Sequence, residues 1–332
     1  MTTLPLLPLP PPKLVGIARL ASEGESLSQR HDVKYLTILS RSLLNRCIVA
    51  RMPFTWTINP YRGCEFACKY CYARYTHEFM EMRDGLDFEK KIFVKQHTAN
   101  LLRSDLRRVK SGEEIAIGTA TDPYQPAERR YEVTRGILEE FSRHAGLDIS
   151  ITTKSDFVLR DLDLLRGIAN RNRLFVNLTI TTLKTALARL LEPRASRPDL
   201  RLEAVRRLNE FGIDAGVNCA PVIPGITDSP RDLEILVKAT AKAGGKYIFA
   251  NPLFLKPCSA AVFMPFLEKE FPELAENYKR RFQNQSFMPT AYRKRLSELM
   301  GCLRAKHGIA ARQARNPSAT PTLPQDVQLR LF

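Results

Sequence analysis

The 332-residue sequence contains no apolar run long enough to form a membrane-spanning helix. Residues 1–12 are rich in Leu and Pro but contain neither a basic n-region nor a cleavage site, so they do not match a secretory signal. We therefore expect no membrane partner and a cytoplasmic location.

Acidic residues are scarce relative to basic ones. The chain has 51 Lys and Arg against 35 Asp and Glu, a formal net charge of +16 and a pI near 9.7. Such an excess attracts polyanions through phosphate contacts, which makes nucleic acid a candidate partner. Residues 277–315 hold ten Lys and Arg against the single acidic residue Glu298. We expect this segment to contact nucleic acid; the alternative is that its charges only face solvent.

The seven cysteines are odd in number, which argues against a disulfide framework and for a reducing compartment. Three of them, Cys64, Cys68 and Cys71, lie within eight residues in the pattern C-x3-C-x2-C. Structural zinc normally has four ligands, and no second cysteine pair follows nearby. A four-iron cluster held by three thiolates would instead leave one iron open.

The middle of the chain alternates between short β-branched runs and helical periodicity. The patterns predict strands at 54–58, 114–118, 148–152, 174–180, 216–220 and 246–250, and helices at 127–144, 157–169, 199–211 and 230–243. This alternation implies an α/β fold with a parallel sheet and right-handed crossovers. Six units favour a partial (β/α)6 TIM-like barrel with an open sheet. A doubly wound sheet is the competing topology.

The remaining segments are expected to flank this barrel. We expect a flexible Pro-rich leader at 1–13, an N-terminal extension at 14–52 with a strand at 35–39, the barrel at 53–270, a basic helical C-terminal extension at 271–315 and a disordered tail at 316–332. The helical spacing of Leu296, Met300 and Leu303 indicates a helix within the basic extension.

Polar residues follow most of the predicted strands. The cysteine loop follows the first strand, residues 119–128 follow the second, Lys154 follows the third and Thr179 ends the fourth. Active sites of parallel α/β folds lie at the carboxyl edge of the sheet. These segments are therefore expected to meet there.

The motif C-x3-C-x-aromatic-C after the first strand of such a chain resembles the radical S-adenosylmethionine (SAM) superfamily. The resemblance implies that Cys64, Cys68 and Cys71 hold a [4Fe–4S] cluster whose open iron binds SAM. It also implies that one electron from an external flavodoxin- or ferredoxin-type donor cleaves SAM to a 5′-deoxyadenosyl radical, which abstracts a hydrogen from the substrate.

Four further segments are similar to the spore photoproduct lyase-like subgroup, many of whose members have no assigned substrate. They are N-P-Y-R-G-C at 59–64, T-D-P-Y-Q-P-A-E at 121–128, E-P-R-A at 192–195 and A-P-V-I-P-G at 220–225. The basic charge and this resemblance together favour nucleic acid as the substrate class.

The resemblance assigns roles by position. Tyr70 would pack near the adenine of SAM, and Lys154, Thr121 and Thr179 would contact SAM, although threonines after strands also cap helices. The lyase uses a cysteine as hydrogen donor at the position of Thr119. A threonine O–H bond is too strong to replace that thiol, so the resemblance does not extend to repair of spore photoproduct by the same route.

Cys258, after the last strand, and Tyr124 are further candidates for catalysis, with Cys258 as a hydrogen donor or as a buried small hydrophobe. Arg201 could bind a substrate phosphate or form a structural salt bridge. A different class of function also fits the sequence. The chain would then be a non-catalytic iron–sulfur or zinc protein, with His77 or a distant residue completing a zinc site, that binds nucleic acid through its basic C-terminal segment.

Overall fold

The structure is a computed structural model that describes residues 14–49 and 52–312. The predicted leader and the predicted tail lie outside these residues. Within them, no helix is long and apolar enough to cross a membrane.

The main sheet has seven strands in the order β11-β10-β9-β8-β7-β4-β3. Their bounds are β3 (Asn45–Arg46), β4 (Trp56–Ile58), β7 (Glu114–Ile117), β8 (Asp148–Thr153), β9 (Arg173–Thr179), β10 (Asp214–Val222) and β11 (Ile248–Pro252). The strands from β4 to β11 are parallel, and β3 joins the edge in the antiparallel sense. The sheet order runs from β11 to β3 without closing, so the predicted six-unit open parallel sheet is confirmed.

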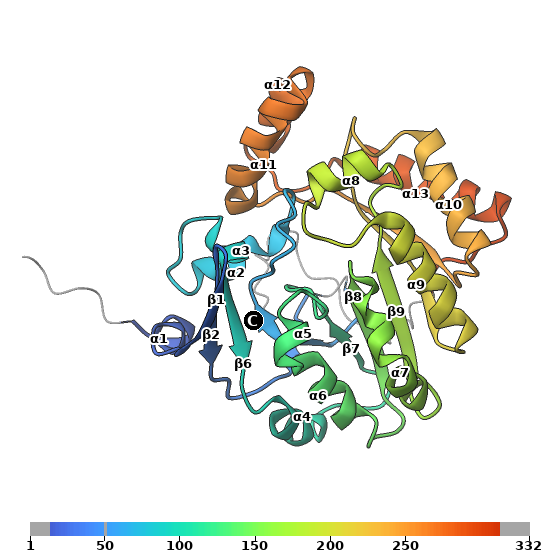
Figure 1. Cartoon of the computed structure of the whole chain (residues 1–332). Helices are drawn as coiled ribbons and strands as arrows, with labels where there is room; N and C mark the ends of the chain where they lie inside the picture. Colours follow the sequence, from blue (N-terminus) through green and yellow to red (C-terminus); the bar gives the residue numbers. More distant parts are fainter. Residues whose placement is uncertain (1–13, 50–51, 313–332) are drawn as a thin grey trace, which may run out of the picture.

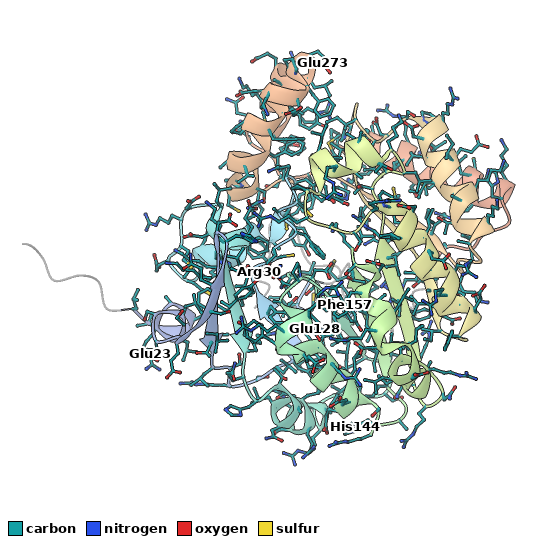
Figure 2. All side chains as sticks on the ribbon, viewed as in Figure 1. Glu23, Arg30, Glu128, His144, Phe157 and Glu273 are labelled. Atoms are coloured by element: carbon teal, nitrogen blue, oxygen red, sulfur yellow. The ribbon has the colours of Figure 1, made fainter. Side chains whose placement is uncertain are left out.

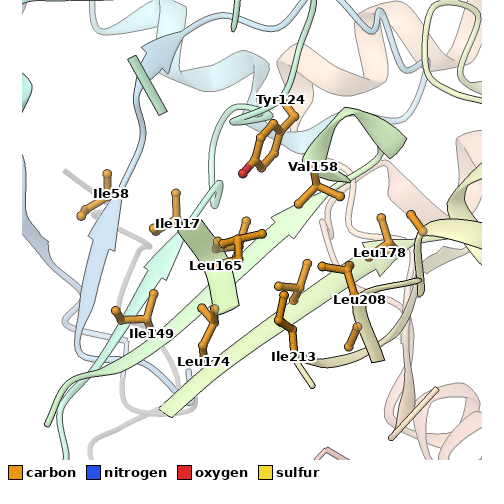
Figure 3. Packing of buried hydrophobic residues seen from close by; sticks show 14 of the residues in the cluster. Ile58, Ile117, Tyr124, Ile149, Val158, Leu165, Leu174, Leu178, Leu208 and Ile213 are labelled. Carbon is orange, nitrogen blue, oxygen red and sulfur yellow. The ribbon is translucent and has the colours of Figure 1, made fainter. Parts of the chain in front are cut away.

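Helices cover the outer face of this sheet (Figure 1). They include α4 (Thr98–Leu106), α7 (Leu162–Ala169), α9 (Pro198–Glu210) and α10 (Pro230–Lys242), with the 3-10 turn η2 (Asp156–Asp161) before α7, while α8 (Thr185–Leu191) packs against the cysteine loop at the end of the sheet. Figure 3 shows how Ile58, Ile117, Ile149 and Leu174 of neighbouring strands pack with Leu165 of α7 and Leu208 of α9. This apolar layer fixes the strands and thereby their carboxyl ends.

The helix predicted at 127–144 is interrupted. The structure has α5 (Glu128–Tyr131) and α6 (Val133–Phe141), separated by Glu132 in a left-handed conformation with φ of +48°. The carboxylate of Glu128, labelled in Figure 2, accepts hydrogen bonds from the backbone N–H groups of Thr134 (2.8 Å) and Arg135 (3.1 Å). The Glu128 side chain thus caps the first turn of α6 although Glu128 itself belongs to α5. It can reach that turn because the chain bends between the two helices.

A second, four-stranded sheet lies beside the main one, in the order β1-β2-β6-β5. It consists of β1 (Ser26–Arg30), β2 (Val33–Ile38), β6 (Lys91–Lys95) and β5 (Tyr61–Arg62), and α1 (Gly16–Ser22) packs against it. The strand predicted at 35–39 is confirmed as β2. The sheet combines the N-terminal extension with the segments on both sides of the cysteine loop, which the sequence did not predict.

Short elements connect the cysteine loop to β6: η1 (Tyr72–Arg74), α2 (Tyr75–Glu78) and α3 (Asp87–Lys90). After β11, α11 (Pro257–Glu270) and α12 (Pro272–Phe282) project from one end of the molecule (Figure 1). The predicted basic helix is confirmed as α13 (Thr290–Lys306), with Leu296, Met300 and Leu303 buried in the main core.

Candidate active site

The cysteine loop begins with a turn that only glycine can form. Gly63 has φ of +84°, and a Cβ there would lie 2.7 Å from the carbonyl oxygen of Lys91 and 2.8 Å from that of Phe88. Cys64 donates its backbone N–H to the Phe88 carbonyl at 2.9 Å. The loop is therefore pressed against the chain between α3 and β6 immediately before its first thiol.

A buried hydrogen-bond network holds this loop against the segment after β7. The Thr121 hydroxyl donates to the Gly63 carbonyl at 2.6 Å, and the Gln125 amide donates to the same oxygen at 3.1 Å. Gln125 also accepts from the backbone of Glu65 at 3.0 Å. The hydroxyl proton of Thr121 is thus used in the bond to the loop. The contact of Thr121 with SAM stays a prediction, and the structure shows in addition that Thr121 positions the cysteine loop.

The three loop cysteines are free thiols, with Cys64 and Cys68 buried and Cys71 half-buried. Burial raises the pKa of Cys64 well above its usual range, and the nearby Asp122 adds to the rise. Burial also raises the pKa of Cys68, to about 12. Such thiols stay protonated unless a metal replaces the proton, so the donor set fits a cationic cluster better than it fits free thiolates.

Within the described ranges, no group of three or more His, Cys, Asp or Glu side chains is arranged to hold a single metal ion. His77, the proposed completing ligand of a zinc site, packs against Phe88 and Phe93 with ring centroids 5.3 and 6.0 Å away. Its Nε2 lies 3.0 Å from the Lys91 carbonyl oxygen. The assignment of a cluster to the loop therefore depends on the motif, the burial of the thiols and the charges around them.

Opposite charges are paired next to the loop. Arg201 Nη1 lies 2.6 Å from Glu192 Oε2, with side-chain exposures of 1% and 0%. The other carboxylate oxygen of Glu192 accepts from the hydroxyls of Tyr70 and Thr181. Burial raises the pKa of Glu192, but Arg201 and Lys154 outweigh it, and the net pKa is lowered. Glu192 is accordingly an ionised carboxylate in the interior, held by the ion pair with Arg201 at one oxygen and by two hydroxyl donors at the other.

Lys154, directly after β8, completes this group. Its ammonium lies 5.9 Å from the ring centroid of Tyr70. Burial lowers the pKa of Lys154, but Cys68, Glu192 and Asp122 raise it by more, so the amine stays protonated. The structure brings Tyr70, Lys154 and Cys68 together, as the sequence predicted for residues at the carboxyl edge.

Asp122 organises the backbone around Lys154. Its carboxylate accepts from the Thr153 hydroxyl at 2.6 Å and from the backbone N–H groups of Lys154 at 2.7 Å and Tyr124 at 2.9 Å. Burial raises the pKa of Asp122 in spite of these donors. Its role in the structure is to fix the turn after β8 to the turn after β7.

Thr179 ends β9 beside the same group. Its carbonyl accepts from Arg201 at 2.8 Å, while its hydroxyl makes no hydrogen bond to any other described residue. The hydroxyl therefore remains free to contact a ligand. The structure supports Arg201 as the salt-bridge residue that was one of its two sequence interpretations.

The two candidates for catalysis differ in their surroundings. Tyr124 is 1% exposed in the main core, and its hydroxyl donates to Asp161 at 3.2 Å, so its packing gives it a structural role. Cys258 is half-buried at the start of α11, and the neighbouring Ser259 hydroxyl donates to the Cys71 carbonyl at 2.8 Å. Cys258 thus lies near the cysteine loop, whereas Tyr124 belongs to the core.

Sequence reasoning did not assign Glu192 to the site. The carboxylate comes from the E-P-R-A segment, which was noticed only as a similarity to a subgroup. A carboxylate directly before Pro, in a polar segment that follows a strand, was the available signal. Its partners Tyr70 and Arg201 could not be identified without the fold.

The comparisons with known proteins agree with this geometry. The family model described as the Radical SAM superfamily matches residues 58–235. An uncharacterised protein of Mycobacterium tuberculosis is 33% identical over 329 residues, covering 98% of this chain and 96% of the relative. An uncharacterised protein of Methanocaldococcus jannaschii is 29% identical over 251 residues, covering 76% of this chain and 86% of the relative.

Solved structures show the same fold. A spore photoproduct lyase variant aligns with a TM-score of 0.64 at 14% identity, covering 89% of this chain and 84% of the lyase. Another variant of that lyase, solved with AdoMet and a dinucleoside spore photoproduct, aligns with a TM-score of 0.63 at 16% identity over the same shares of the two chains. The sheet is therefore of the partial-barrel type. The chain belongs to the radical SAM superfamily, whose members are SAM-dependent radical enzymes that typically bind a [4Fe–4S] cluster and SAM.

Proposed function

We propose that Cys64, Cys68 and Cys71 hold a [4Fe–4S] cluster and that the chain cleaves SAM reductively to abstract hydrogen from a substrate. When bound, the cluster and SAM supply the electron transfer and the radical chemistry. The observation that carries the proposal is the position of three buried or half-buried thiols beside the charged group of Lys154, Glu192 and Arg201, at the carboxyl edge of the sheet. An external donor of the flavodoxin or ferredoxin type would deliver the electron.

The residues around the loop have separate tasks in this proposal. Lys154 keeps its proton and can donate to a carboxylate or ribose oxygen of SAM. Tyr70 presents its ring for contact with adenine while its hydroxyl stays bound to Glu192. Thr179 offers a free hydroxyl. Thr121 positions the loop from behind through the Gly63 carbonyl.

The elements after the loop shield the third thiol. The Tyr72 hydroxyl donates to the Thr119 carbonyl, and the Tyr72 ring lies 6.2 Å from that of Phe254. Ser259 of α11 bonds to the Cys71 carbonyl. These contacts join the cysteine loop to the segment after β11, which limits the access of water to chemistry at Cys71.

Anaerobic reconstitution tests the proposal. The full chain, supplied with iron and sulfide, should turn brown and bind about four irons per chain, the content of one such cluster. With SAM and dithionite, and again with reduced flavodoxin, it should release 5′-deoxyadenosine. A colourless protein that holds one tight zinc and never cleaves SAM would establish the non-catalytic alternative instead.

We further propose nucleic acid as the substrate class, because exposed positive charge is left without ion pairs in two places. Arg280, Arg281, Arg293 and Arg295 of α12 and α13 are exposed and make no ion pair among the described residues. A cavity of about 410 Å³ between β1 and α5 is lined by Arg30, Arg129 and Arg130, together with Tyr35, Pro126, Ala127 and Tyr131. Figure 2 labels Arg30 on this side of the molecule.

Salt dependence tests this choice. Binding of a fluorescent single strand should weaken linearly in log affinity against log salt, with a slope of about −0.7 per phosphate neutralised. Removing the charges of Arg293 and Arg295 together should reduce the slope. A variant in Arg206, an exposed residue of α9 that is paired with Glu203 and Glu210, serves as the control. A protein that shows no binding at low salt would not act on nucleic acid.

A further inference from the structure

Lys95, the last residue of β6, is a buried residue whose ammonium has no counter-ion among the described residues. Its residue is 5% exposed, and the ammonium makes no hydrogen bond or ion pair with any other described residue. Burial lowers its pKa to about 7, and the only charge that adds to the shift is another cation, Arg62. Burying a charge is unfavourable unless a partner compensates it, so this lysine calls for an anion that the described chain does not supply.

The register of the second sheet places Arg62 beside Lys95. In the antiparallel pair β5–β6, Tyr61 faces Val94 and Arg62 faces Phe93. Residues two apart on a strand project from the same face, so Arg62, Phe93 and Lys95 share one face of the sheet. Diagonal neighbours in such a pair are about 7–8 Å apart, within the reach of long side chains. The Arg62 guanidinium and the Lys95 ammonium can therefore both contact a single anionic group of a ligand.

Two further donors, one on Arg62 and one on Tyr75, lack acceptors. The Arg62 Nε is buried and has no hydrogen-bond partner, and the same is true of the hydroxyl of Tyr75 in α2. Burial raises the pKa of Tyr75 to about 12, and Arg62 is among the groups that act on it. The ammonium of Lys256 lies 3.8 Å from the Tyr75 ring centroid. The region thus combines positive charge with unsatisfied donors.

Among the described residues, no carboxylate acts on Arg62 or Lys95. Glu78 of α2 is exposed, and it acts on Cys258 and Lys256 rather than on Arg62 or Lys95. Buried unsatisfied donors are rare in proteins because each costs free energy. Here the two donors belong to side chains that act on each other electrostatically, Arg62 and Tyr75, and an anionic acceptor beside them would provide what both lack.

We propose that Arg62, Lys95 and Tyr75 form a binding site for an oxyanion of a ligand, either a phosphate or a carboxylate. Arg62 offers a planar fork of N–H donors, Lys95 a point charge and Tyr75 a neutral O–H donor. The site adjoins the cysteine loop, since Arg62 lies two residues before Cys64. The oxyanion therefore belongs to the molecule on which the radical acts, a step that rests on the proposed function.

Calorimetric titration and thermal melting of the full chain test the site directly. Inorganic phosphate, dimethyl phosphate and acetate are added at constant ionic strength, with chloride as the balancing anion. At least one should bind saturably and raise the melting temperature, and comparison of the three separates phosphate from phosphodiester and carboxylate ligands. If none of the three does so above the chloride control, the site is refuted.

The variant Lys95→Met distinguishes a ligand site from a structural lysine. It should melt at a higher temperature than the wild type in chloride, because an uncompensated charge is removed, and it should bind the active anion at least tenfold more weakly. Lys34→Met is the matched control, because Lys34 is an exposed lysine of the same sheet and should change neither property. A lower melting temperature with an unchanged anion response would overturn the proposal.

Tyr75→Phe provides a second variant that preserves shape. It removes one donor and should weaken anion binding several-fold without lowering the melting temperature. Equal anion binding by the wild type, Lys95→Met and Tyr75→Phe contradicts the assignment. If the wild type shows the anion response but never cleaves SAM, the oxyanion site stands and the proposed function fails. If it cleaves SAM but shows no response, the reverse holds.

Discussion

Two groups of buried charge flank the cysteine loop, and they differ in how the protein balances them. On one side, Glu192 is surrounded by Arg201, Tyr70 and Lys154, and its carboxylate oxygens contact three partners. On the other side, Lys95 lies diagonally across from Arg62 in the β5–β6 pair, and neither has an acidic partner among the described residues. Each group combines buried and half-buried side chains, and both lie beside the same loop.

The difference indicates what each side is for. A charge that is paired and hydrogen-bonded within the protein stays ionised without any ligand, and it can hold neighbouring side chains in place. A buried charge without a partner is costly and is balanced only when something binds. The side of Glu192 is thus complete in the free protein, whereas the side of Lys95 is completed by its ligand. Four measurements would break or sharpen this comparison.

The largest effect is expected for Cys68→Ala. Loss of one of three ligands should abolish the cluster and the cleavage of SAM, whereas the ion pair of Glu192 with Arg201 is untouched and should keep the fold. Iron content, visible absorbance and far-UV circular dichroism measure the two outcomes separately. The control is Cys302→Ala, which removes an exposed thiol of α13. Global unfolding of Cys68→Ala would point to a structural metal.

The second largest effect is expected for the group around Glu192. Glu192→Gln leaves Arg201 and Lys154 without their anion, so the free energy of unfolding should fall by about 3–5 kcal/mol. The same substitution in an exposed pair, Glu203→Gln opposite Arg206, should cost at most about 1 kcal/mol. Urea denaturation of both variants measures the contrast. Equal losses would show that Glu192 is not a compensated buried charge.

A smaller effect follows from the lowered pKa of Lys95. Its folded pKa is about 7, below the ordinary value of 10.5. Between these values the unfolded chain binds more protons, so stability should rise with pH, and below about pH 7 the penalty is fully present. From about pH 7 to 9, wild type should gain about 2 kcal/mol relative to Lys95→Met. Parallel pH profiles of wild type and variant would contradict a buried, unpaired ammonium.

The smallest effect concerns the loop between the two sides. Thr121→Val removes the hydrogen bond to the Gly63 carbonyl and should cost about 1 kcal/mol of stability. Thr121→Ser keeps the hydroxyl and should restore most of it. Chemical denaturation and iron content measure how well the cysteine loop is held in place, and SAM affinity measures the predicted contact of Thr121 with SAM. A loss of SAM affinity without any loss of stability would make Thr121 a ligand contact only.

The strands and the thiol motif could be predicted because their signals are local. Each of the six strands is a short apolar run between turn residues, and all six were confirmed within a few residues of their expected positions. The second sheet escaped prediction because β5 has two residues and pairs with a strand about thirty positions later, a contact that local periodicity does not encode. The break at Glu132 depends on the side chain of Glu128 reaching the next helix.

Residue spacing along the chain was sufficient to indicate three thiols for a cluster, the parallel sheet that carries them and the excess of positive charge. The tertiary structure alone decided which of those charges are balanced. Tyr70 and Glu192 are 122 positions apart and hydrogen-bonded, while Arg62 and Lys95 are diagonal neighbours on paired strands with no acidic partner among the described residues. Electrostatic energy depends on distance in space and on burial, and both are set only when strands from distant parts of the sequence pair.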